Sequence, residues 1–145
     1  MIRNKTYPVD CEVPNIQKKY PDQCRITEAI DAPYAIYQKL MDDADVQLDQ
    51  LYSYTPSMNS LLAMAKGVIV LGGGEEENYE IINEKELRPI INVYPSEEDI
   101  FQKLEYIVLN KERIPELSAQ SIEYVRKHHN YVKVAQQYVD FWEAH

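Results

Sequence analysis

The sequence has few glycines and cysteines, and it lacks any long apolar run. Its 145 residues include four glycines and two cysteines. Cys11 and Cys24 do not form a C-x-x-C pair and have no histidine nearby, which argues against a structural zinc site. No stretch approaches the roughly 18 consecutive apolar residues of a membrane-spanning helix. The N-terminal segment MIRNKTYPVDCEVP has no apolar core of the signal-peptide type. We therefore expect a cytoplasmic protein with reduced thiols.

Positive charge is also scarce. Lysine and arginine number 15 against 24 acidic residues, and the formal net charge is −9. This balance argues against a nucleic acid or an anionic membrane surface as partner. An acidic surface mainly keeps a protein soluble.

Hydrophobic patterning predicts alternating strands and helices from residue 24 onward. The uncharged run Val68–Gly74 suits a central parallel strand that is covered on both faces. The predicted strands are 24–29, 45–51, 68–74 and 88–95, and the predicted helices are 32–44, 57–66, 76–87, 96–110, 115–127 and 130–145. Such alternation predicts an α/β fold, a Rossmann-like parallel sheet flanked by helices with a helical C-terminal extension. We expect residues 26–145 to form this domain, after a poorly defined segment 1–25 that carries a short helix near residues 16–20.

All four glycines lie within one stretch of the sequence. Gly67 follows a predicted helix and suits its C-terminus. The run Gly72–Gly74 ends a predicted strand, where a backbone turns sharply or approaches a ligand. It is neither a P-loop nor a dinucleotide fingerprint, because the required spacings are missing. Three glutamates follow, Glu75–Glu77, and they would repel a phosphate. A tight structural turn and a sugar-facing loop both remain open, and a solvated helix face explains the glutamates better than a metal site does.

Two loops at the predicted ligand-binding edge of the sheet carry the unusual residues. Ligands of parallel sheets lie outside the carboxyl ends of the strands, which here means residues 50–57 and 72–78. Thr55–Asn59 opens a helix without negative charge and so suits an anion, although Ser57 also fits an ordinary N-cap. The candidate ligand contacts are Tyr52, Tyr54, Thr55, Ser57, Met58, Asn59, Gly72, Gly73, Gly74 and Glu75.

Residues 44–82, ADVQLDQLYSYTPSMNSLLAMAKGVIVLGGGEEENYEII, resemble the donor-binding half of GT-B glycosyltransferases of the retaining, family-4 or group-1 kind. Such proteins carry AD, PS, EAMA-x-G, PVV, GG and E-x-I in this order. The segment INVYPSEEDIFQKLEYIVLN and the last two helices also resemble this family, so that the similarity covers about residues 26–145. The resemblance implies transfer of a hexose from a nucleotide sugar in carbohydrate biosynthesis, with no metal or other cofactor. The glycine-rich loop and the helix opened by Ser57 would then hold the donor and its diphosphate.

The sequence departs from the family pattern at two positions. Two family glutamates, eight positions apart, hold the donor sugar and the ribose, and they would fall at Tyr54 and Leu62. A leucine side chain accepts no hydrogen bond. Asp49, Gln50, Tyr52 and Tyr54 lie on one loop and offer polar groups in their place. The catalytic residues remain unassigned.

The resemblance also predicts partners. A full GT-B enzyme pairs this half with an N-terminal acceptor domain that is absent from residues 1–145, so we expect a fragment that is inactive alone. The acceptor of such enzymes can be membrane-associated, although this sequence has no membrane segment. The last helix of the family crosses back to the other domain. Tyr138, Phe141 and Trp142 would then be exposed here, and exposed aromatic side chains favour a homodimer.

Two other functions remain open. Loss of both glutamates favours a non-catalytic binding or scaffold module. Asp42, Asp43 and Asp49 suggest a receiver-like signalling domain, but the first two lie at a predicted helix end and no lysine follows a late strand. His128 and His129 fit a surface pair at a helix end better than a catalytic site.

Overall fold

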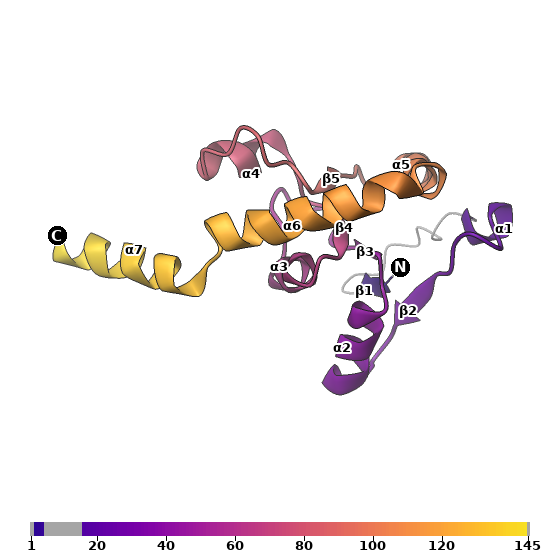
Figure 1. Ribbon diagram of the computed structural model, residues 1–145, viewed down its shortest axis with the longest axis horizontal. Coiled ribbons are helices and arrows are strands. Elements are labelled where there is room, and N and C mark those ends of the chain that lie inside the picture. Colours follow the sequence, from indigo (N-terminus) through magenta and orange to yellow (C-terminus); the bar gives the residue numbers. More distant parts are fainter. Residues whose placement is uncertain (1, 5–15, 145) are drawn as a thin grey trace.

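The computed structural model, which describes residues 2–4 and 16–144, is a five-stranded parallel sheet flanked by helices (Figure 1). The strand order is β2-β1-β3-β4-β5, and every neighbouring pair is parallel. This confirms the predicted Rossmann-like α/β fold with a helical C-terminal extension. The strands are β1 (Ile2–Asn4), β2 (Thr27–Ala29), β3 (Val46–Leu48), β4 (Ile69–Gly72) and β5 (Ile91–Asn92). The helices are α1 (Ile16–Lys19), α2 (Tyr34–Asp42), α3 (Met58–Ala65), α4 (Glu76–Ile81), α5 (Glu97–Leu109), the 3-10 helix η1 (Lys111–Arg113), α6 (Ile114–His128) and α7 (Tyr131–Glu143).

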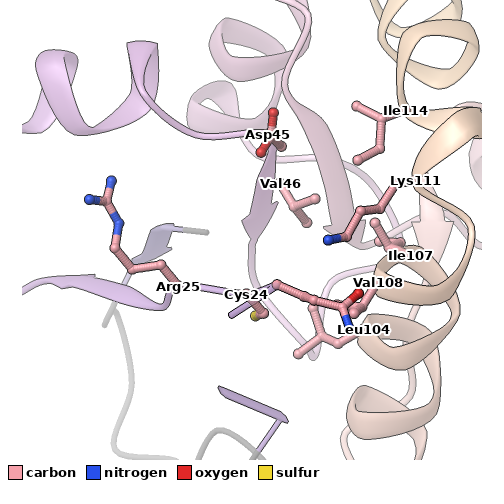
Figure 2. A pocket seen from close by; sticks show the side chains of 10 residues that line it. Cys24, Arg25, Asp45, Val46, Leu104, Ile107, Val108, Lys111 and Ile114 are labelled. Atoms are coloured by element: carbon pink, nitrogen blue, oxygen red, sulfur yellow. The ribbon is translucent and has the colours of Figure 1, made fainter. Parts of the chain in front are cut away.

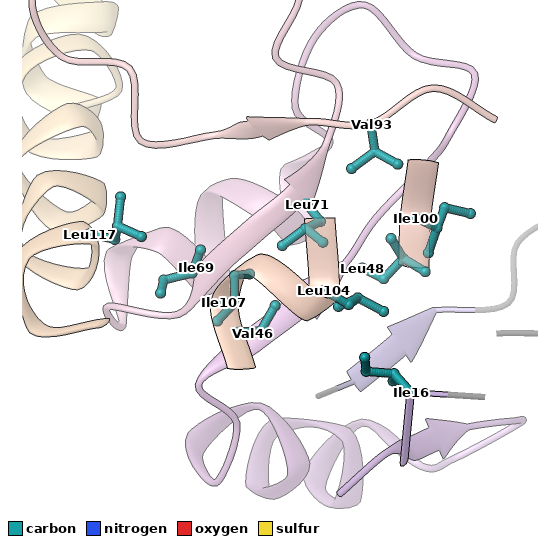
Figure 3. Close-up of a cluster of buried hydrophobic side chains, with 10 residues drawn as sticks. All are labelled: Ile16, Val46, Leu48, Ile69, Leu71, Val93, Ile100, Leu104, Ile107 and Leu117. Carbon is teal, nitrogen blue, oxygen red and sulfur yellow. The ribbon is translucent and has the colours of Figure 1, made fainter. Parts of the chain in front are cut away.

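Strand β4 divides the hydrophobic core into two clusters. Its side chains alternate between the faces of the sheet, and all four of its residues are buried. Val70 packs with residues of α2, α3, α4 and α6. Ile69 and Leu71 point to the other face and pack against α1 and α5, where Ile16 and Leu104 are buried (Figure 3). Burial on both faces explains the uncharged sequence of this strand.

Strand β1 is a part of the sheet that the sequence pattern does not predict. It lies between β2 and β3, with Ile2 opposite both Thr27 and Gln47. The chain therefore moves outward from β1 to β2 and then returns across β1 to β3. In open α/β sheets, the crevice for a ligand lies where the strand order reverses in this way. The reversal places the loop after β3, residues 49–57, beside that crevice.

Two of the helices end at a residue whose backbone has the left-handed conformation, with a positive φ. Gly67, at φ +82°, ends α3, and its N–H donates to Met64 while Val68 N–H donates to Ala63. Asn83, at φ +51°, ends α4 with the same pair of hydrogen bonds. The Gly67 end matches the prediction. The predicted helix 76–87 was too long, because Asn83 adopts a backbone conformation that few non-glycine residues reach.

The two C-terminal helices differ in how they contact the rest of the protein. Helix α6 packs along α3, and Tyr124 is fully buried. Helix α7 projects away from the sheet and ends at the C-terminus (Figure 1), and none of its residues is buried. No helix in the described ranges is long and apolar enough to cross a membrane.

Gln47 in β3 is fully buried, and neither polar atom of its side chain has a hydrogen-bond partner within the described part of the chain. An unpaired buried amide lowers stability by about 1–3 kcal/mol. We therefore expect Gln47→Met, which keeps the volume without the amide, to raise the free energy of unfolding by about 1 kcal/mol in urea titrations. Gln47→Glu should lower it, because a charge would replace the amide. A Gln47→Met variant less stable than wild type would show that the amide has a favourable interaction.

Candidate functional site

The loop after β3 is fixed to helix α3 by a carboxylate. Asp49 directly follows β3, is only 6% exposed, and its N–H donates to Leu71 of β4 at 2.8 Å. Its side chain accepts hydrogen bonds from the Ser57 hydroxyl at 2.9 Å and from the Ser57 N–H at 3.3 Å. Ser57 Oγ in turn accepts from the N–H of Ser60 at 3.1 Å, so Ser57 is the N-cap of α3. The predicted cap is confirmed, and Asp49 holds it in place.

The two predicted ligand loops meet at Gly73. A Cβ atom added to Gly73 would lie 2.4 Å from the carbonyl oxygen of Ser53 and 2.7 Å from that of Thr55. Both distances are too short for any side chain, so glycine is required by close contact between two backbones. Ser53 also bonds within its own loop, because its hydroxyl donates to Thr55 O at 2.7 Å. The structure thus brings Thr55 and Gly73 together at the carboxyl edge of the sheet.

The two glycines that flank Gly73 are also in close contact with neighbouring elements. An added Cβ at Gly72 would lie 3.1 Å from Cβ of Asp49, and one at Gly74 would lie 2.9 Å from Cγ2 of Ile90. The N–H of Gly74 donates to Asn92 Oδ1 at 3.2 Å, which ties the turn to the end of β5. The three glycines therefore pack the ends of β3, β4 and β5 together, and their conformations need no positive φ.

Exposed apolar side chains lie on the loops at this edge. Tyr52, Tyr54 and Met58 are 70%, 69% and 80% exposed, and Tyr94, just after β5, is 60% exposed. Asn59, Glu75 and Gly74 are half-buried. Flat aromatic faces in such positions can stack on a sugar or a base. Asn92 and Tyr94 belong to the edge but were not among the candidate contacts, and Asp49, considered as a replacement for the missing glutamates, bonds to Ser57 instead. Asn92 ends β5 and Tyr94 follows it by two residues, and this position at the carboxyl end of a predicted strand is the signal that identifies them.

The helix starts at this edge differ in charge. The first turn of α3 has no acidic residue. The first turn of α4 has Glu76 and Glu77, and that of α5 has three acidic residues. An anion is stabilised by the N–H groups at a helix start and is repelled by carboxylates there. A carboxylate also lies at the N-cap of α3, that of Asp49, but it is buried and already accepts the two hydrogen bonds of Ser57. Of these three helices, α3 has the fewest carboxylates in its first turn and so offers the best place for a phosphate. The described residues contain no group of three or more side chains suited to a metal ion.

Positions 54 and 62, where the resembled family carries glutamates, lie in different surroundings. Tyr54 is exposed, whereas Leu62 is half-buried and packs against the core cluster around Val70. A side chain at position 62 therefore contacts the protein interior. The acidic residues considered for a receiver-like site do not form one cluster either. Asp42 ends α2 and forms an ion pair with Lys66 of α3, whereas Asp49 follows β3.

His128 was predicted to be a surface residue, and this was wrong. Its side chain is 13% exposed, and Nε2 lies 2.6 Å from Oε2 of Glu84. Lys127 Nζ donates to the same oxygen at 2.6 Å, and the N–H groups of Glu86 and Leu87 donate to Oε1 at 2.9 and 3.1 Å. Lys127, His128 and these N–H groups hold the pKa of the Glu84 carboxyl far below its usual range. This carboxylate ties the loop after α4 to the end of α6.

His129 also faces the interior rather than solvent. Its ring centroid lies 5.5 Å from that of Tyr124, and its Nε2 is buried without a hydrogen-bond partner among the described residues. Burial lowers the pKa of His129, and the neighbouring His128 lowers it further. Both histidines are therefore packing residues at the α6–α7 junction, which the helical pattern alone did not show.

A cavity of about 220 Å³ lies at the opposite edge of the sheet, beside the amino end of β3. Val46, Leu104 and Ile107 give it an apolar wall, and Asp45 and Lys111 carry opposite charges at its rim. Figure 2 shows the Lys111 amino group directed into this space and the Arg25 guanidinium directed away from it. Cys24, a free thiol, also lines the cavity, and burial raises its pKa. Cys11 lies outside the described residues. None of the predicted ligand contacts lines this cavity.

Comparison with known proteins identifies the family. A family model described as "Glycosyl transferase-like" matches residues 7–140. No curated protein matches the chain. Because the family match covers most of the sequence, the chain belongs to this glycosyltransferase-like family, and the receiver-like alternative is set aside.

Proposed function

We propose that this glycosyltransferase-like chain is the half of a retaining transferase that binds the nucleotide-sugar donor at the carboxyl edge of its sheet. The observation that carries the proposal is the contact of two loops at Gly73, next to the start of α3, whose first turn has no acidic residue and whose N-cap Ser57 is bonded to Asp49. Both loops belong to the segment that resembles the donor-binding half of such enzymes. The free thiol of Cys24 fits a reducing compartment, so we expect the cytoplasm as its location.

The proposed diphosphate position is the first turn of α3. Asp49 already accepts the hydrogen bonds of Ser57, so the diphosphate would use the next N–H groups, those of Met58 and Asn59. These N–H groups would stabilise the negative charge that develops on the leaving diphosphate, without a metal. Tyr52 and Tyr54 would contact the sugar or the base with exposed rings. The carboxylate of Asp49 would keep the N-cap in position rather than contact the phosphate.

A second candidate function is a non-catalytic binding module. The observation that favours it is Leu62, which packs against the core where the resembled enzymes carry a glutamate. In that case the chain would have lost the carboxylates that bind the donor sugar and ribose but kept the fold. Catalysis by a donor-binding half would need the proposed acceptor domain, whereas a non-catalytic binding module would not. We expect the isolated chain to show no sugar transfer from a radiolabelled donor.

Nucleotide binding tests the proposal. We expect ligand-observed NMR against UDP, GDP, ADP and CMP to show saturable binding of one nucleotide. Ser57→Tyr should weaken that binding at least about tenfold, because the ring would cover the N–H groups of the first turn.

Ser96→Tyr is the matched control. Ser96 is the N-cap of α5 and accepts from Asp99 N–H at 3.1 Å, so both variants lose the same kind of cap. Ser96→Tyr should leave nucleotide binding unchanged. Equal weakening in both variants would indicate a general loss of structure. Absence of binding by wild type would favour the non-catalytic module.

A further inference from the structure

Helix α7 presents an apolar face that no other part of the described chain covers. Tyr131, Tyr138 and Trp142 are 82%, 62% and 73% exposed, and no residue of α7 belongs to either core cluster. At about 100° per residue these three side chains project from one side of the helix, with Ala135 between them. Lys133 and Asp140 lie on the opposite side. Solvent exposure of three large aromatic side chains on one stripe marks an interaction surface.

The sequence of α7 is nearly symmetric about the bond between Gln136 and Gln137. Each large or apolar residue on one side has an apolar counterpart at the same distance on the other side. The mirrored pairs are Ala135 with Tyr138, Val134 with Val139, Val132 with Phe141, and Tyr131 with Trp142. A twofold axis between two antiparallel helices brings mirrored positions opposite each other where both lie on the contacting face, as Tyr131 with Trp142 and Ala135 with Tyr138 do, and each such contact occurs twice. The other two pairs lie on the flanks of that face.

We propose that two copies of this chain associate through the aromatic faces of antiparallel α7 helices, with the twofold axis between the helices at the height of the Gln136–Gln137 bond, which itself lies on the far, polar side of α7. In this arrangement the ring of Tyr138 packs over the small side chain of Ala135 in the other copy. Tyr131 then lies beside Trp142 of the other copy at each end of the contact. Lys133 and Asp140 stay in solvent, where Asp140 accepts a hydrogen bond from Gln136 at 2.7 Å in its own helix.

The surface available matches what a small homodimer needs. Aromatic side chains bury about 150–250 Å² each, so covering the three rings and the adjacent valines would remove about 600 Å² per copy. The two copies together would bury about 1,200 Å², the lower end of the range for specific interfaces. The projection of α7 from the sheet (Figure 1) leaves room for a second helix beside it. We expect a dimer whose population depends on concentration.

Sedimentation equilibrium over a concentration series tests the dimer. Wild type should fit a monomer–dimer equilibrium, and Tyr138→Glu should raise the dissociation constant about 30-fold or more, because a central aromatic anchor is replaced by a charge. Gln137→Glu is the matched control: it adds the same charge to the polar side of α7 and should leave the equilibrium unchanged. A wild-type monomer at every concentration, or a dimer that Tyr138→Glu leaves intact, would overturn the proposal. If the chain is monomeric, the apolar face of α7 would instead be a contact surface for another domain of a longer protein.

Disulfide formation tests the orientation in chains whose Cys11 and Cys24 are replaced by serine. In the antiparallel pair, position 142 of one copy lies opposite position 131 of the other, while the two positions 142 lie about 16 Å apart along the helix axis. A mixture of Tyr131→Cys and Trp142→Cys chains should therefore form the mixed disulfide in preference to either symmetric one. Preferential cross-linking of Trp142→Cys with itself would indicate parallel helices and contradict the proposal.

Discussion

Replacing Gly73 by alanine is expected to lower the free energy of unfolding by about 3 kcal/mol, because the added methyl group collides with backbone atoms that cannot rotate away. The nearest of these, Ser53 O and Thr55 O, would lie 2.4 and 2.7 Å from the new carbon. The loop after β3 must shift to relieve this collision. Urea titrations followed by circular dichroism would measure the loss.

Gly72→Ala is the matched comparison for Gly73→Ala. The same methyl group would meet Asp49 Cβ at 3.1 Å, so the neighbour needs to move by only a few tenths of an ångström. We expect a loss of about 1 kcal/mol. If the two variants were equally stable, the loop would be pliable and the contact at Gly73 would not fix it. The same pair of variants also reports on function, since a displaced loop at residues 53–55 should weaken nucleotide binding more in Gly73→Ala.

Replacing Glu84 by alanine should cost about 2–3 kcal/mol, because two backbone N–H groups lose a charged acceptor, while Lys127 is half exposed and can be solvated. The side chain is 2% exposed and its two oxygens accept from Lys127, His128 and two backbone N–H groups. The variant would leave the N–H groups of Glu86 and Leu87 unpaired and remove the counter-charge of Lys127. Glu123→Ala is the control, because Glu123 forms an exposed pair with Arg126. It should stay close to wild type in the same denaturant titration.

The pH dependence of stability gives an independent test of the Glu84 carboxylate. Its pKa is lowered in the folded protein from an ordinary value of 4.5, so the folded state binds this proton less readily than the unfolded state. The stabilisation is therefore complete above about pH 5 and is lost as the pH falls from there toward the lowered folded-state pKa. We expect the difference between wild type and Glu84→Gln to shrink over this acid range. A difference that stays constant down to about pH 3 would contradict the assignment of the effect to this charge.

The strand–helix alternation was predictable because burial imposes strong local patterns. β4 is covered on both faces and carries no charge, and the apolar stripe of α5 matches its buried residues Ile100, Leu104 and Ile107. The N-caps Ser57 and Ser96 were also readable, since a short polar side chain before an apolar helix satisfies free N–H groups in a local way.

The remaining features depend on contacts between residues far apart in sequence. β1 is three residues long and gains its place only by pairing with β2 and β3, so no periodicity identifies it. The burial of His128 follows from Glu84, which is 44 positions away. In the candidate site, the glycines indicated a close approach, but the partner of that approach, the Ser53–Thr55 backbone, became known only from the fold. The bond between Asp49 and Ser57 likewise required the geometry.

The place of β1 has a consequence for how the molecule opens. β3, β4 and β5 follow one another along the chain and pair in that order, so this half can assemble from successive units. β2 is an edge strand whose neighbour is β1, and β1 reaches β3 across more than forty residues of sequence. Release of three residues would therefore separate β2 from the sheet while β3–β5 stay paired. Amide protons of β2 should exchange with solvent through this partial opening, faster than those of β4, which require global unfolding.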